Sequence, residues 1–143
     1  MAYCTQDDIS PAQLDEDILV QLTDDDGDGD VVDDPVDRAI ADAGAEIDAY
    51  CMGRYTVPLS PVPAMIRRIA VDMAIYHLYS RRGDPPGNRV DRYKNAIRFL
   101  EKVSTGGITL GVAEPTVSDS TQPVRVSTDK DDRTFTMAKM TGF

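Results

Sequence analysis

Residues 63–82 read PAMIRRIAVDMAIYHLYSRR and predict one long helix. Proline suits the first position of a helix, because its ring already holds the helical φ and its missing N–H would have no partner there. The apolar residues that follow cover more than one helical face, where a surface helix would show a single stripe. We therefore expect this helix to be the central and most buried one of a mainly α fold.

Further helices are predicted on both sides of this segment. Residues 35–53 begin with proline, end near Gly53 and repeat apolar residues at three- and four-residue steps, as amphipathic helices do. Residues 89–104 show the same spacing. Three prolines between positions 58 and 63 exclude a helix there and predict an extended connection.

The N-terminal region contains two predicted helix starts. Thr5 can cap a helix whose first turn holds acidic residues, and Ser10-Pro11 offers a cap followed by a proline at the first helical position. An apolar stripe then runs to about Leu22. Residues 1–107 are thus predicted to form one helical domain, a small bundle of about four helices.

Residues 108–143 have a different character and are predicted to form an extended C-terminal arm or β-hairpin. Residues 108–112 are β-like, and residues 124–128 and 133–137 flank a polar turn at 129–132. A lone hairpin is only marginally stable in water. We therefore expect this arm to pair with the helical domain or with another chain.

The formal net charge of the 143-residue chain is −10, and it is unevenly distributed. Residues 1–50 contain 16 acidic residues and one basic residue, whereas residues 51–103 contain 4 acidic and 10 basic residues, which gives nets of −15 and +6. One interpretation is a solvated acidic face. The other is self-complementarity, in which the acidic face of one copy meets the basic face of the next and the contacts close into a ring. The net negative charge disfavours free nucleic acid as the main partner.

Enzymatic activity is disfavoured by the residues that the chain lacks. One histidine, His77, and two cysteines, Cys4 and Cys51, do not supply the usual zinc sites or Ser-His and Cys-His pairs. No phosphate-binding loop, dinucleotide fingerprint or nucleophile elbow is present. The start of the chain shows no signal peptide, and no run of residues is apolar enough to span a membrane. We expect free thiols, a reduced cytoplasmic setting and no enzyme.

An acidic loop between residues 24 and 34 is the strongest chemical motif. Its alternating carboxylates and a glycine at the sixth position match the start of an EF-hand loop, whose oxygens wrap calcium. The twelfth position, which needs a glutamate, is Pro35. The loop is therefore either a calcium site or an acidic connection that meets a basic neighbour. The predicted ligands are Asp24, Asp26, Asp28 and Asp30.

Two arginine pairs mark the ends of the predicted central helix, and they are Arg67 with Arg68 and Arg81 with Arg82. They are either solvated helix ends or the basic side of a subunit or partner interface, where they would meet an acidic face or DNA inside a ring.

Four segments of the chain resemble the Mu-like phage and prophage head–tail joining proteins, also called head completion or adaptor proteins. They are LTDDDGDGD (22–30), AIADAGAEIDAY (39–50), GRYTVPL (53–59) and VPAMIRRIAVDMAIYHLYSRR (62–82). The resemblance covers roughly residues 3–105.

The resemblance implies an all-α adaptor with an extended C-terminal arm and no enzymatic activity. It implies a ring of about twelve copies beneath the portal protein, which supports the tail or its terminator protein and lets DNA pass through its lumen. Such a protein assembles in the host cytoplasm and ends at the head–tail junction of the virion. The competing hypothesis is a calcium-binding helical interaction module.

Overall fold

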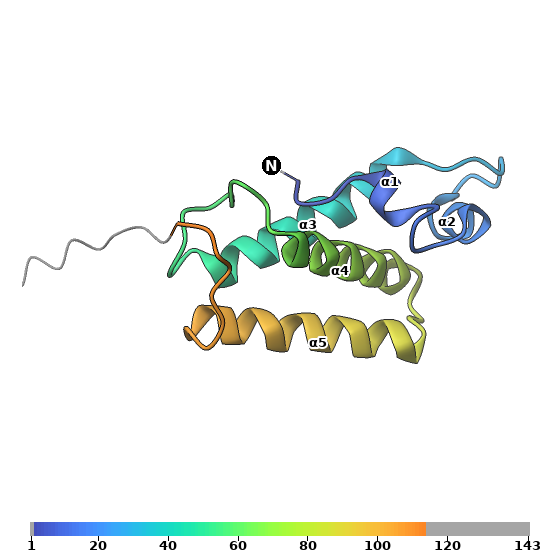
Figure 1. Cartoon of the computed structure of the whole chain (residues 1–143). Coiled ribbons are helices and arrows are strands. Elements are labelled where there is room, and N and C mark those ends of the chain that lie inside the picture. The colour runs from blue at the N-terminus through green and yellow to red at the C-terminus, as the bar shows by residue number, and fades with distance from the viewer. Residues whose placement is uncertain (1, 114–143) are drawn as a thin grey trace, which may run out of the picture.

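The central element of the fold is helix α4 (Ala64–Arg82), as the sequence predicts. The computed structural model describes residues 2–113. Helix α4 contacts all the other helices, namely α1 (Gln6–Ile9), α2 (Glu16–Thr23), α3 (Asp33–Cys51) and α5 (Gly87–Ser104). The three long helices form a bundle, and the two short N-terminal helices lie at one end of it (Figure 1).

Helix α4 is buried on several faces because its apolar residues are not confined to one stripe. Its buried residues are Ile66, Ile69, Ala70, Val71, Met73, Ala74, Ile75 and Leu78. Helix α5, by contrast, buries only Ala96, Leu100 and Val103. Gly83 ends α4 in the left-handed region at φ 95°, which its lack of a Cβ permits, and its N–H donates to the carbonyl oxygen of Tyr79 at 3.2 Å.

The extended connection between α3 and α4 is tied to both ends of the described chain. The Leu59 N–H donates to the Tyr3 hydroxyl at 2.9 Å, and the Leu110 N–H donates to the Tyr55 hydroxyl at 3.0 Å. Tyr3, Tyr55 and Leu59 are all buried. The connection therefore belongs to the core despite its lack of regular structure.

The N-terminal prediction is partly wrong. A helix does start after Thr5, whose backbone N–H donates to the Asp8 carboxylate at 2.9 Å. Ser10-Pro11 does not start the next helix. Residues 10–14 form a turn that closes on the carbonyl oxygen of Ile9, so α2 begins only after Asp15. Over residues 2–113 the structure therefore contains five helices, and α1 is only a single turn.

The β-like segment at residues 108–112 is not a strand, because no second strand lies beside it within residues 2–113. Its alternation is nevertheless real. Ile108, Leu110 and Val112 pack against the core, and the residues between them are exposed. The predicted hairpin at 124–137 falls outside the described residues.

Candidate functional site

The acidic loop between α2 and α3 is organised by the side chain of Asp24. One of its carboxylate oxygens accepts the Gly27 N–H at 2.6 Å, and the other accepts the Gly29 N–H at 3.1 Å. The bond from Gly27 is the main reason why the pKa of Asp24 lies below its usual value. Both glycines have positive φ, near 79° and 87°, which lets the chain curl around this carboxylate.

The side chains of the predicted calcium ligands are not brought together in this arrangement. Both oxygens of Asp24 already accept N–H groups of the loop, and Asp28 accepts the Asp30 N–H at 3.3 Å. In the part of the chain that the structure describes, no three His, Cys, Asp or Glu side chains are grouped to hold a metal ion. Calcium binding by these residues stays a prediction.

Arg81 and Arg82, at the end of α4, bind the acidic loop of their own chain. Both guanidinium groups contact the Asp25 carboxylate, and Arg82 Nη2 lies 3.2 Å from its Oδ1. Arg81 also donates to the carbonyl oxygen of Leu22 at 2.9 Å, and Arg82 donates to that of Asp24 at 2.6 Å. These carbonyls lie at the C-terminal end of α2, where a helix leaves its last carbonyl groups without partners of its own. The two arginines supply those partners and so hold the acidic loop against the end of α4.

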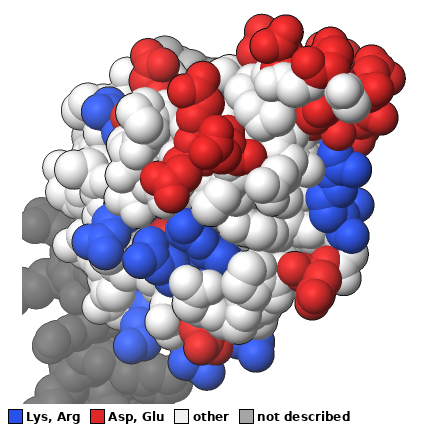
Figure 2. Space-filling view, turned by 90° about the vertical axis from the view of Figure 1, so that its right-hand side faces the viewer, with Lys and Arg blue, Asp and Glu red and all other residues white. Residues whose placement is uncertain are grey.

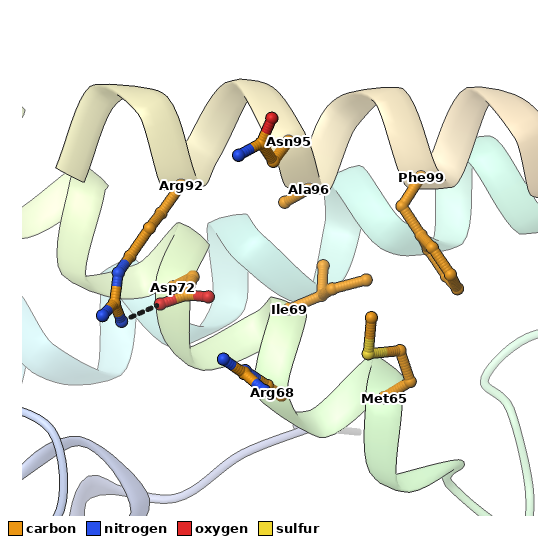
Figure 3. A pocket seen from close by; sticks show the side chains of 8 residues that line it. All are labelled: Met65, Arg68, Ile69, Asp72, Arg92, Asn95, Ala96 and Phe99. Atoms are coloured by element: carbon orange, nitrogen blue, oxygen red, sulfur yellow. Dashed lines mark hydrogen bonds and ion pairs between the residues drawn. The ribbon is translucent and has the colours of Figure 1, made fainter. Parts of the chain in front are cut away.

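Arg67 and Arg68, one helix length away, are exposed. Arg67 lies near Asp8, whose pKa is held low chiefly by the Thr5 N–H and, to a lesser extent, by this arginine. Arg68 faces a different way, into a groove between α4 and α5 (Figure 3). The four predicted arginines are therefore not one surface. Arg81 and Arg82 bind the acidic loop, and Arg68 lines a groove.

The α4–α5 groove has a volume of about 320 Å³. It is lined by Met65, Arg68, Ile69, Asp72, Arg92, Asn95, Ala96 and Phe99. Met65 and Phe99 lie at one end, and Arg92 bonds Asp72 at 3.2 Å at the other (Figure 3). Half of the Met65 side chain is exposed, at 48%. The groove therefore offers an apolar end and a charged end.

Acidic and basic side chains are largely separated on one face of the molecule. Figure 2 shows most of the acidic side chains over the upper part of one face and most of the basic ones below them. This separation follows from the chain order, because the acidic first third builds α1 to α3 and the basic residues belong mainly to α4 and α5.

The comparisons with known proteins point to one phage family. The family described as "Bacteriophage Mu, Gp36" matches residues 3–128. The chain belongs to this gp36 family. It is 40% identical over 79 residues to "Mu-like prophage FluMu protein gp36" of Haemophilus influenzae, and the match spans 55% of each chain. It is 30% identical over 116 residues to "Gene product J" of Escherichia phage Mu, which covers 81% of this chain and 80% of that relative.

The gp36-family chain is thus a phage or prophage protein with a mainly α fold. The chain spans about half the length of the Haemophilus relative. Within residues 2–113, none of the helices is long and apolar enough to cross a membrane.

A polar cluster that joins the three long helices of this gp36-family chain was missed from the sequence. Glu46 of α3 accepts the Tyr93 hydroxyl of α5 at 3.0 Å, and its other oxygen lies 3.0 Å from His77 Nε2 of α4. Although the two atoms are this close, the His77 contact does not have the geometry of a directed hydrogen bond. The Tyr93 ring stacks on Tyr76, with centroids 4.1 Å apart. No spacing rule links these residues, because each lies on a different helix from Glu46.

We expect Tyr93→Phe to lower the free energy of unfolding by about 1 kcal/mol, since it removes the hydroxyl that Glu46 accepts. Denaturant unfolding followed by circular dichroism measures this change. Tyr79→Phe on α4 is the matched control, because within residues 2–113 no hydrogen bond involves its hydroxyl. An equal effect of both substitutions contradicts a role for the Glu46 bond.

Proposed function

We propose that the chain is a structural subunit that joins the phage head to the tail, as one copy of a ring of about twelve through which DNA passes. Its partners are other copies of itself, the portal protein on the head side, and the tail or its terminator protein on the other side. DNA is only the content of the lumen, and no membrane takes part. The ring assembles in the host cytoplasm and stays at the head–tail junction of the virion.

The observation that carries this proposal is the separation of charge over the helical body of a gp36-family chain. A ring subunit needs two different faces that fit each other, because each contact in the ring joins the front of one copy to the back of the next. An acidic side built from α1 to α3 and a basic side built from α4 and α5 are such a pair. The proposal includes no catalytic step and no required cofactor.

Native mass spectrometry or light scattering at high protein concentration tests the proposal. We expect a discrete species of about ten to thirteen copies at low salt. We also expect it to dissociate as salt rises, because salt screens contacts between exposed charges. A chain that stays monomeric at every concentration and salt level contradicts self-assembly into a ring.

Calcium binding by the acidic loop is the alternative proposal, and the same experiment separates it. A calcium-dependent module loses its assembly when a chelator is added and regains it with calcium. The ring proposal expects assembly to be equal in chelator and in calcium, since its contacts join protein surfaces directly and need no ion.

A further inference from the structure

We propose that the α4–α5 groove of one copy receives the outward face of α3 from a second copy. This inference rests on the proposed ring and names the surfaces that build it. The outward face of α3 together with Met52, which follows the helix, is called the α3 stripe here. It is the set Asp34, Asp37, Ala41, Ala45 and Met52, all of which are exposed, and Met52 is 65% exposed.

The two surfaces lie on opposite sides of the bundle, as a head-to-tail contact requires. Helix α3 uses its buried face to pack on α4 and α5, so its stripe points away from them. The groove opens on the other side of α4 and α5, and α3 runs behind both helices in the view of Figure 3. One copy can therefore offer the groove to one neighbour and the stripe to the other without occupying the same surface twice.

The two surfaces differ in the size of their side chains. The larger side chains of Met65 and Phe99 lie at the apolar end of the groove. Ala41 and Ala45 are small, and together with Gly44 they line a hollow on α3 that Ala2 of the N-terminal segment borders. Small side chains let a second helix approach closely, and the larger apolar side chains then fill the space between them.

The charges are complementary along the same direction. Arg68 is exposed beside the groove and takes part in no ion pair within residues 2–113. Asp37 is exposed one helical turn before Ala41. A neighbour whose Ala41 and Ala45 lie against Met65 and Phe99 brings Asp37 toward Arg68. Arg68 follows Met65 by three residues and Asp37 precedes Ala41 by four, so each charge lies about one helical turn, or about 5 Å, from the apolar contact.

A charge exchange tests the pairing in the full-length chain. We expect Arg68→Glu alone and Asp37→Arg alone each to raise the protein concentration at half assembly by about tenfold or more. The double variant R68E/D37R restores an attractive pair with reversed signs, so we expect its assembly to return toward that of the wild type. Light scattering across a concentration series measures all three.

Control variants separate this contact from a general effect of charge. Arg98→Glu changes the net charge as Arg68→Glu does but lies outside the groove, and Asp17→Arg is the equivalent for Asp37→Arg. We expect assembly of both controls to stay near the wild-type level. All the substituted side chains are exposed, so we expect only small changes in melting temperature, the largest for Asp17→Arg because Asp17 lies in the first turn of α2.

The outcomes distinguish the contact from the ring itself. If the wild type assembles and Arg68→Glu assembles as well as Arg98→Glu does, the groove contact is wrong and the ring stands. If Arg68→Glu blocks assembly but Asp37→Arg does not, the groove receives something other than the α3 stripe, and the inference is wrong. A wild type that never assembles overturns the ring and this inference together.

Discussion

Leu78→Ala is expected to lower the free energy of unfolding by about 3 kcal/mol, the largest effect of a single substitution that we predict. Leu78 is fully buried on α4, the helix that contacts every other helix. Alanine removes three carbons from this site and leaves a cavity, because the long helices packed around it cannot close it completely. Denaturant unfolding of dilute protein, followed by the helical circular dichroism signal, measures the loss.

Met65→Ala on the same helix is the matched control, because its side chain is 48% exposed. We expect it to change the free energy of unfolding by less than about 1 kcal/mol. Equal losses at the two positions are incompatible with a central α4 that is buried around Leu78.

The contrast between α4 and the N-terminal region shows what the sequence can predict. The apolar residues of α4 repeat over five turns, so the predicted range of 63–82 differs from the observed Ala64–Arg82 by one residue. The region before α2 offers only local capping signals. Ser10-Pro11 carries such a signal, but the turn that closes on Ile9 occupies residues 10–14, so the helix begins only after Asp15.

The candidate surfaces were less predictable, because they depend on contacts between residues far apart in the chain. The sequence predicts Arg81 and Arg82 either as solvated helix ends or as part of a partner interface, and it gives no sign that both contact Asp25, more than fifty residues earlier. The α4–α5 groove arises from the way in which two helices pack, and none of the residue types that line it is typical of a groove. The separation of charge, by contrast, could be read directly, because it follows the order of the chain.

The Tyr3 hydroxyl was not predicted to matter, and it joins three parts of the fold. It donates to the Asp48 carboxylate of α3 and accepts the Leu59 N–H from the connection before α4, at 2.9 Å. Tyr3 is 3% exposed, so water cannot easily replace it. Removal of this one oxygen leaves the buried Leu59 N–H without its acceptor, which is more costly than the loss of a bond at the surface.

We therefore expect Tyr3→Phe to lower the free energy of unfolding by about 2 kcal/mol at neutral pH. Burial, and then the bond to Asp48, raise the pKa of Tyr3 above its ordinary value of 10.0. Because the folded pKa is the higher one, the stabilisation from Tyr3 is fully present below pH 10 and is lost as the pH rises toward the folded pKa. The difference between wild type and Tyr3→Phe should thus shrink above pH 10.

Denaturant unfolding of both proteins at neutral pH and at several values above pH 10 measures this difference, and comparison at each pH cancels the titration of the other tyrosines. Tyr50→Phe is the control, because within the described residues its hydroxyl takes part in no hydrogen bond, and we expect it to stay within about 0.5 kcal/mol of the wild type. A Tyr3→Phe penalty that is constant through the alkaline range would mean that the hydroxyl proton is not what the Asp48 and Leu59 contacts depend on. If Tyr3→Phe does not change the free energy of unfolding at neutral pH, the Tyr3 hydroxyl does not stabilise the contact between the N-terminus and the connection before α4.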